Sequence, residues 1–357
     1  MASPKTVLFC GGGSVGHVAP SLAVAQALTK HSQGIRTVFI CMKRSEETWL
    51  LTHAGVRFST LPPLRVPSTY SPRAFLFPFS FLQTFLRSLI ILRREHPDAV
   101  FSKGGTVSIP VCLAAWCKHI PVVLHESDSV LSRSGSFLAR LARKVCTGFV
   151  IDGLPSQIQQ KVVRTGNPVR EEILRGSRSA GQRITRFSGR RPVLLVIGGS
   201  QGAASLNKVV EKSFEKLIDL ADIIHLTGAG KAISRTHARY FARPFVTEEL
   251  PHLYALADVA VTRAGAGVLA ELAALRKPAI VIPLTGEAHD HQLKNAENLA
   301  ARGAVELLPQ QQLPELPERI ASLLRDGERR QRLGGNLARA FPSGAAERIA
   351  RILLDVL

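Results

Sequence analysis

The sequence predicts an α/β protein built from two doubly wound parallel sheets, and three observations support that prediction. Short apolar strands alternate with helical segments along most of the 357 residues, with glycine-containing turns between them. An apolar strand followed by Gly-Gly-Ser-x-Gly occurs twice, at residues 12–16 and 198–202. A chain of this length suits about two domains. We therefore expect two similar halves whose glycine turns face a shared cleft, since ligands bind at the carboxyl ends of parallel strands.

Apolar runs bounded by turn residues predict the strands of the first half at residues 6–10, 37–41, 56–61, 99–102 and 121–125. Helices are predicted at residues 21–30, 74–95 and 111–118, with Pro20 in the first turn of the first helix. Residues 64–72 and 126–135 are predicted to be loops.

The segment at 165–170, with the basic run at 175–191, is predicted to be a hinge. The pattern then restarts with a strand at 193–197, a glycine turn and a helix from Ala203.

Composition and charge favour a globular protein with anionic partners. Hydrophobic residues make up 45% of the chain and charged residues 20%, and the net charge is +19. Such a charge favours nucleic acid, acidic lipid or phosphorylated substrates. Five cysteines in mostly apolar surroundings suit a reduced cytosolic protein. We recognise no signal peptide, and no apolar run reaches the ~20 residues of a spanning helix.

Residues 258–298 carry the densest group of candidate ligand-binding side chains. A strand, a glycine turn and a helix start follow one another, which makes an anion site from backbone N–H groups and the positive helix end. Glu271, about one turn inside the helix, is placed to accept hydrogen bonds from two vicinal hydroxyls. A polar cluster follows the next strand at Glu287, His289, Asp290, His291, Gln292 and Asn295. The segment predicts a nucleotide-sugar site, and metal binding by its histidines is the weaker alternative.

Seven motifs occur in order along the chain: GGGSVGHVAPSLAVA, KGGTVSIPV, IPVVLHESD, TGNPVR, VIGGSQGAASLN, RAGAGVLAE and DHQLKNAENL. Together they resemble the MurG family of bacterial N-acetylglucosaminyltransferases. The resemblance implies the GT-B architecture, two Rossmann-like domains facing a cleft. It divides the chain into an acceptor- and membrane-binding domain (1–163), a UDP-GlcNAc-binding domain (164–340) and a C-terminal helix returning to the first domain (341–357).

The resemblance also implies an activity. An inverting hexosyltransferase would move N-acetylglucosamine from UDP-GlcNAc to the muramoyl-peptide sugar of lipid I, giving lipid II for peptidoglycan synthesis. No cofactor and no obligatory metal are implied. The implied partners are lipid I, an anionic membrane surface and proteins of cell-wall synthesis and division, but no nucleic acid. The implied location is peripheral, on the cytoplasmic face of the bacterial cell membrane.

Carried over residue by residue, the resemblance makes His17 the general base, and an unperturbed imidazole pKa near ~6.5 suits that role. Val15, where the family usually has glycine, is expected to contact donor or acceptor phosphate together with its neighbours in the turn. Asp128 is expected to bind sugar hydroxyls, and Arg170 and Ser200 the donor diphosphate. Glu271 is assigned to the ribose and Gln292, with Asn295, to the N-acetylglucosamine. The remaining substrate-binding residues are Ser14 and Gly16 at phosphate, Val246 and Thr247 at uracil, and Ala266, Gly267, Val268 and Leu269, whose N–H groups face phosphate.

An aromatic stretch flanked by arginines predicts a membrane-binding patch, with one helix face in the core and the other on lipid. Its residues are Phe75, Phe79, Phe81, Leu82, Phe85, Arg73 and Arg87.

Three other functions share some of these features. A UDP-GlcNAc epimerase would have the same fold and donor site without the membrane patch. A nicotinamide dehydrogenase would need an acidic residue after the second strand, where the sequence has Lys43 and Arg44. A nucleic-acid binder fits the charge, but no recognised motif supports it.

Overall fold

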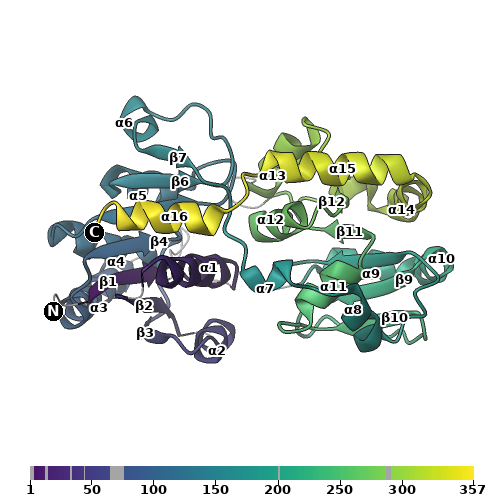
Figure 1. The fold of residues 1–357 in the computed structure, drawn as a ribbon, viewed down its shortest axis with the longest axis horizontal. Helices are drawn as coiled ribbons and strands as arrows, with labels where there is room; N and C mark the ends of the chain where they lie inside the picture. Colours follow the sequence, from purple (N-terminus) through teal and green to yellow (C-terminus); the bar gives the residue numbers. More distant parts are fainter. Residues whose placement is uncertain are drawn as a thin grey trace. The chain divides into compact units, whose positions relative to one another are not determined.

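The computed structural model describes residues 4–12, 15–32, 34–43, 45–64, 76–199, 202–286 and 291–357. These residues form two compact units (Figure 1). The first unit comprises residues 1–168 and 344–357, and the second comprises residues 169–343. The C-terminal segment therefore belongs to the same unit as the N-terminus.

The first unit contains a sheet of seven parallel strands in the order β3-β2-β1-β4-β5-β6-β7. Its strands are β1 (Lys5–Cys10), β2 (Ile35–Met42), β3 (Arg57–Leu61), β4 (Ala99–Ser102), β5 (Val122–Glu126), β6 (Lys144–Thr147) and β7 (Val162–Arg164). Its helices are α1 (Val15–His31), α2 (Ser45–His53), α3 (Phe77–Glu95), α4 (Ser108–Cys117), α5 (Arg133–Leu141), α6 (Ser156–Gln159) and α16 (Ala345–Leu354).

Alternate residues of β1 enter two separate cores, as a sheet covered by helices on both faces requires. Val7 and Phe9 pack with side chains of α1 and α16, among them Leu353. Leu8 and Cys10 pack with side chains of α3, α4 and α5. In Figure 1 the yellow α16 runs beside the dark α1, and the two helices are in contact.

The second unit repeats this architecture with six parallel strands in the order β10-β9-β8-β11-β12-β13. Its strands are β8 (Val193–Ile197), β9 (Asp222–Leu226), β10 (Tyr240–Arg243), β11 (Val259–Thr262), β12 (Ala279–Val281) and β13 (Glu306–Leu307). Its helices are α7 (Glu171–Leu174), α8 (Arg178–Thr185), α9 (Ala204–Lys212), α10 (Phe214–Leu220), α11 (Leu250–Leu256), α12 (Ala266–Ala274), α13 (His291–Ala300), the 3-10 helix η2 (Gln310–Glu315), α14 (Leu316–Arg325) and α15 (Gly327–Ala340).

The two units divide between residues 168 and 169, inside the first segment of the predicted hinge, but the predicted continuation of the hinge through 175–191 was wrong. That run contains α8, which packs on α11 inside the second unit. A Cβ on Gly181 would lie 2.5 Å from the His252 carbonyl oxygen, so this glycine permits the close helix contact. The Arg178 guanidinium also pairs with Asp258, Nη1 to Oδ1 at 3.0 Å. The run therefore contains an ordered helix with packing partners, and two of its basic residues, Arg178 and Arg183, lie in that helix.

Two helices begin earlier than their apolar patterns suggested. α1 starts at Val15, so Pro20 lies inside it and cannot donate to the carbonyl of Gly16. α12 starts at Ala266 with Gly265 as its N-cap residue. In both cases the glycine-rich turn forms the first turn of the helix. This brings His17 and Gly267 to helix starts, where N–H groups lack partners inside the helix.

Candidate functional site

The first unit gathers titratable side chains at the carboxyl ends of its central strands. β1 and β4 are neighbours in the sheet although β2 and β3 intervene in the chain. Such a reversal of strand order is where doubly wound sheets bind ligands. His17 lies in the first turn of α1, Lys103 follows β4, and Glu126 ends β5.

His17 is half-buried, and its ring packs against a glycine turn. A Cβ on Gly105 would lie 3.1 Å from the His17 Cε1 atom and 3.3 Å from Nδ1, so a side chain at 105 would crowd the imidazole. Burial, and then the charge of Lys103, lower the pKa of His17 to about 4. The ordinary value assumed from the sequence was therefore wrong. The ring is neutral at pH 7 and available to accept a proton.

Lys103 was not singled out from the sequence, although it opens one of the motifs. Its side chain is buried, and its Nζ lies 2.8 Å from His125 Nδ1 and donates to Ser127 Oγ. Burial lowers the pKa of Lys103 to about 8, and the charges of Glu126 and Asp128 oppose that shift. A lysine between an apolar strand and a glycine turn is the sequence signal that would have identified it.

The loop after β5 carries two carboxylates. The Asp128 N–H donates to Glu126 Oε1 at 3.3 Å. Burial, and then Asp128, raise the pKa of Glu126 to about 7. Sequence reasoning chose Asp128, which is half-buried in this loop, and missed Glu126, the carboxylate whose pKa lies near neutrality.

The first glycine turn is only partly described. Ser14 lies outside the described residues, Val15 is the first residue of α1, and Gly16 is exposed in the first helical turn. The N–H groups of this turn have no acceptor inside the helix, which suits an anion.

In the second unit, the start of α12 is the corresponding candidate for an anion site. Gly267 is exposed and Val268 is half-buried, whereas Ala266 and Leu269 are buried. The Leu269 N–H donates to the Gly265 carbonyl at 3.1 Å. The predicted phosphate contact of Leu269 was therefore wrong, because its N–H is already used within the helix. The first-turn groups of Gly267 and Val268 keep that role as a hypothesis.

Glu271 is held by a buried tyrosine. The Tyr254 hydroxyl donates to Glu271 Oε2 at 2.7 Å. Burial raises the pKa of Glu271, and the Tyr254 hydrogen bond and the charge of Arg170 oppose the rise. Arg170 thus interacts electrostatically with Glu271 inside the second unit, and its Nε is buried with no hydrogen-bond partner among the described residues. Tyr254 is a further residue that sequence reasoning missed.

Two residues of the predicted sugar site form hydrogen bonds with backbone groups. Gln292 Oε1 accepts from the Leu284 N–H at 3.1 Å, and Asn295 Nδ2 donates to the Ala264 carbonyl at 3.2 Å. Asn295 is fully buried, so the predicted sugar contact was wrong and its described role is to hold the turn before α12.

The other candidates vary in exposure. Val246 is buried and Thr247 half-buried before α11. Ser200 lies outside the described residues, as does His289. No group of three His, Cys, Asp or Glu side chains within the described ranges is arranged to hold a metal ion.

Helix α3 has an unusual distribution of side chains. Its buried face combines Ile91, Leu92 and Glu95 with Thr84 and Ser88, whose hydroxyls donate to carbonyls one turn earlier. Its outer face carries large apolar residues, with exposed fractions of 73% for Phe79, 52% for Leu82 and 66% for Ile90. Phe81 and Phe85 are only half-buried, and Phe85 packs against the core. An apolar outer face is typical of a binding surface.

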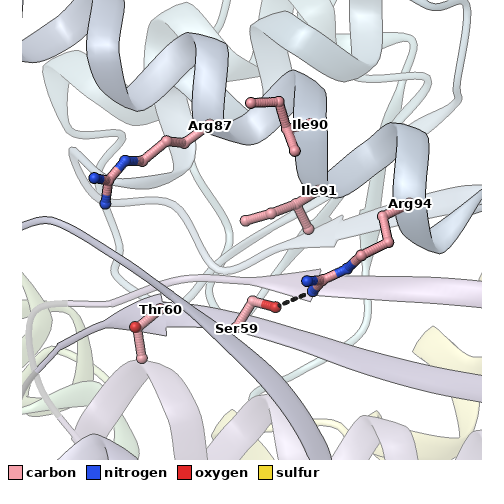
Figure 2. Close-up of a pocket in the computed structure, with 6 residues that line it drawn as sticks. All are labelled: Ser59, Thr60, Arg87, Ile90, Ile91 and Arg94. Atoms are coloured by element: carbon pink, nitrogen blue, oxygen red, sulfur yellow. Dashed lines mark hydrogen bonds between the residues drawn. The ribbon is translucent and has the colours of Figure 1, made fainter.

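A shallow pocket of about 280 Å³ lies between β3 and α3. Figure 2 shows Arg87, Ile90, Ile91 and Arg94 of α3 on one side of it and Ser59 and Thr60 of β3 on the other. Arg94 Nη2 donates to Ser59 Oγ at 2.8 Å, whereas the exposed Arg87 extends away from the other side chains shown. The apolar face of α3 is thus bordered by guanidinium groups. Phe75 and Arg73 of the predicted patch lie outside the described residues. No described helix is long and apolar enough to span a bilayer.

Two family models match the chain. The glycosyltransferase family 28 N-terminal domain matches residues 7–147, and the C-terminal domain of the same family matches residues 193–349. A Clostridium kluyveri protein named UDP-N-acetylglucosamine--N-acetylmuramyl-(pentapeptide) pyrophosphoryl-undecaprenol N-acetylglucosamine transferase is 34% identical over 84% of this chain and 85% of that protein.

One solved structure gives the same grouping, and a second shares only the fold. MurG of Acinetobacter baumannii has a TM-score of 0.73 and 25% sequence identity, covering 99% of this chain and 100% of that one. UDP-GlcNAc 2-epimerase from Neisseria meningitidis, bound to UDP-GlcNAc, has a TM-score of 0.68 at 16% identity, covering 98% of this chain and 100% of that one. The second similarity concerns the fold alone. The predicted fold class, two parallel-sheet domains of GT-B type, is confirmed.

Proposed function

This chain belongs to the MurG family of glycosyltransferases, and on that premise we propose that it transfers N-acetylglucosamine from UDP-GlcNAc to lipid I. The product would be lipid II, the disaccharide precursor of peptidoglycan. The single observation that carries the proposal is the 34% identity to a relative of that name along both units. An epimerase shares the fold, but its substrate is a soluble nucleotide-sugar, so its reaction would not require the exposed apolar face of α3.

The second unit is proposed to bind the donor. Glu271 is oriented by Tyr254 and accepts hydrogen bonds from the ribose hydroxyls, while the N-terminus of α12 receives the diphosphate. Gln292 contacts the N-acetylglucosamine, and Val246 and Thr247 contact uracil. Arg170 and Ser200 complete the diphosphate site, since charge-assisted hydrogen bonds suit a dianionic group.

The first unit is proposed to bind the acceptor and activate it. The neutral His17 imidazole removes the proton as the muramoyl hydroxyl attacks the anomeric carbon of the donor, and UDP leaves with inversion. An acceptor diphosphate bound at Val15 and Gly16 would add negative charge that opposes Lys103 and raises the pKa of His17. Asp128 binds acceptor or donor hydroxyls. Charge on the leaving UDP is offset by the α12 N-terminus and Arg170, so the proposed reaction uses no metal.

The outer face of α3 is proposed to bind the membrane in which lipid I resides. Phe79, Leu82, Leu86 and Ile90 provide the apolar contact, with Arg87 beside them for anionic headgroups. This arrangement supports peripheral binding to a membrane. The proposed location is the cytoplasmic face, with proteins of cell-wall synthesis and division as the proposed neighbours.

The activity is tested by following lipid II formation from UDP-GlcNAc and a short-chain lipid I analogue in EDTA-containing buffer. The wild-type protein should form the disaccharide. His17→Ala should lower kcat by about 100-fold or more, the usual contribution of a general base. The control is His31→Ala, an exposed histidine in the last turn of the same helix, which should retain activity. Normal turnover by His17→Ala contradicts the role of this residue, and N-acetylmannosamine without any disaccharide indicates an epimerase.

The donor site is tested by calorimetric titration with UDP and 2′-deoxy-UDP. Glu271→Gln should bind UDP about tenfold more weakly, because hydrogen bonds to a carboxylate contribute roughly 1.5–3 kcal/mol. The variant should also lose the preference for UDP over the deoxy compound, which is the specific signature of a ribose contact. Glu297→Gln, an exposed site on α13, is the control. If Glu271→Gln keeps the full preference for UDP, the ribose assignment is wrong.

The membrane surface is tested by co-sedimentation with vesicles containing phosphatidylglycerol. Leu82→Glu combined with Ile90→Glu should reduce the bound fraction at least about tenfold, because each change puts a charge into the apolar contact. Leu174→Glu, on α7 of the second unit, is the matched control with 53% exposure. Equal binding by all three proteins would contradict the assignment of α3.

A further inference from the structure

Lys103 is a buried lysine with neutral hydrogen-bond partners. Only 6% of its surface is exposed, and its Nζ contacts His125 Nδ1 and Ser127 Oγ. Placing an ammonium in such surroundings is costly unless its hydrogen bonds and nearby charges offset the loss of water. The backbone of Lys103 is fixed as well, because its N–H donates to the Cys10 carbonyl at 2.9 Å. Both ends of the side chain are thus anchored beside the first glycine turn.

The partner of Lys103 is held in a defined tautomer. His125 Nε2 lies 3.0 Å from the Gly166 carbonyl oxygen, which only accepts hydrogen bonds. Nε2 therefore carries the proton, and Nδ1 accepts from the Lys103 ammonium. The neighbouring Thr165 carbonyl accepts from Arg348 of α16, with Nη2 at 2.8 Å. A chain of contacts thus links the C-terminal helix, the loop after β7, β5 and Lys103, all within the first unit.

The loop after β5 is fixed by the same contacts. Ser127 accepts from Lys103 through its side chain, and its carbonyl accepts from Asn167 Nδ2 at 3.0 Å. Ser127 lies between the two carboxylates of the loop, Glu126 and Asp128. The orientation of both carboxylates therefore depends on how Ser127 is held.

We propose that Lys103 is a positioning residue for the transfer reaction: its ammonium fixes the loop at 126–128 and places a positive charge near His17. The inference rests on the proposed acceptor reaction of the first unit. Lys103 does not touch the reacting atoms in this account. It acts through His17, which accepts the proton, and through the carboxylates that meet the acceptor.

The titratable groups that face Lys103 come from every element around it: His17 of α1, His125 and Glu126 of β5, Asp128 of the following loop and Cys146 of β6. Its charge lowers the pKa of His17 and of Glu126. Removing the charge must therefore raise both pKa values. Since the base acts unprotonated, the acidic limb of the pH–rate profile would move to higher pH.

The test compares the pH dependence of kcat/KM for a lipid I analogue in wild-type, Lys103→Met and Lys103→Arg proteins. Methionine matches the lysine stem without the charge, so the acidic limb should rise by about one pH unit and kcat should fall about tenfold or more. Arginine keeps the charge, so its acidic limb should stay near that of the wild type even if kcat falls. Lys144→Met, an exposed site at the start of β6, is the control.

The pH position of the acidic limb of the pH–rate profile distinguishes a positioning role from a structural one. A merely structural defect lowers kcat but leaves the acidic limb at the same pH. An unmoved acidic limb in Lys103→Met overturns the proposal whatever happens to kcat. If Lys103→Met fails to fold, Lys103→Arg provides the test. An acidic limb that moves to higher pH by about one pH unit in Lys103→Arg overturns the proposal. UDP affinity, a property of the second unit, should be unchanged in both variants. A wild-type protein that makes no lipid II would refute the proposed function, whereas an active wild type with an unmoved limb refutes only the role of Lys103.

Discussion

Both proposed sites depend on one constraint, the parallel order of each sheet, which brings the ends of β1 and β4, and of β8 and β11, to the same edge. A buried cation follows the fourth strand of each unit at that edge. Lys103 follows β4 and binds His125 of β5, and Arg263 follows β11 and donates to the carbonyls of Ile282 and Pro283 after β12. Each cation thus hydrogen-bonds to the segment that follows the next strand, Lys103 to Ser127 and Arg263 to Ile282 and Pro283. The two differ chemically, since a guanidinium stays charged whereas a buried ammonium titrates.

The doubly wound fold was predictable because buried parallel strands are short apolar runs separated by glycine turns. The repeated Gly-Gly-Ser-x-Gly correctly indicated two related halves. The helix starts were harder to predict, because the first turns of α1 and α12 contain the glycines that indicated a turn before each helix. α8 was mistaken for a hinge because its charged residues suggested solvent, and only its packing on α11 shows otherwise.

The sequence predicted those candidate site residues that stand in a recognisable motif. It did not predict roles that depend on contacts with residues distant in the chain. Motifs pointed to His17 and Glu271, whose roles stay predictions, but the low pKa of His17 follows from burial and from Lys103, which lies 86 positions away in the chain. Asn295 and Leu269 carried the right residue types, yet one is buried and the N–H of the other is used within its helix. Tyr254 gave no sequence signal, and the pattern around Lys103 did not reveal its role, because both roles arise from contacts between separate strands and helices.

The central claim is a division of labour, with the donor held by the second unit and the acceptor by the first. Amide hydrogen exchange measured with UDP-GlcNAc alone, and then with a lipid I analogue alone, tests it most directly. The donor should slow exchange at residues 202–206 and 265–271 and leave residues 103–108 and 126–130 unchanged, while the acceptor analogue should do the reverse. Protection of residues 126–130 by UDP-GlcNAc, without protection around Glu271, would contradict the account.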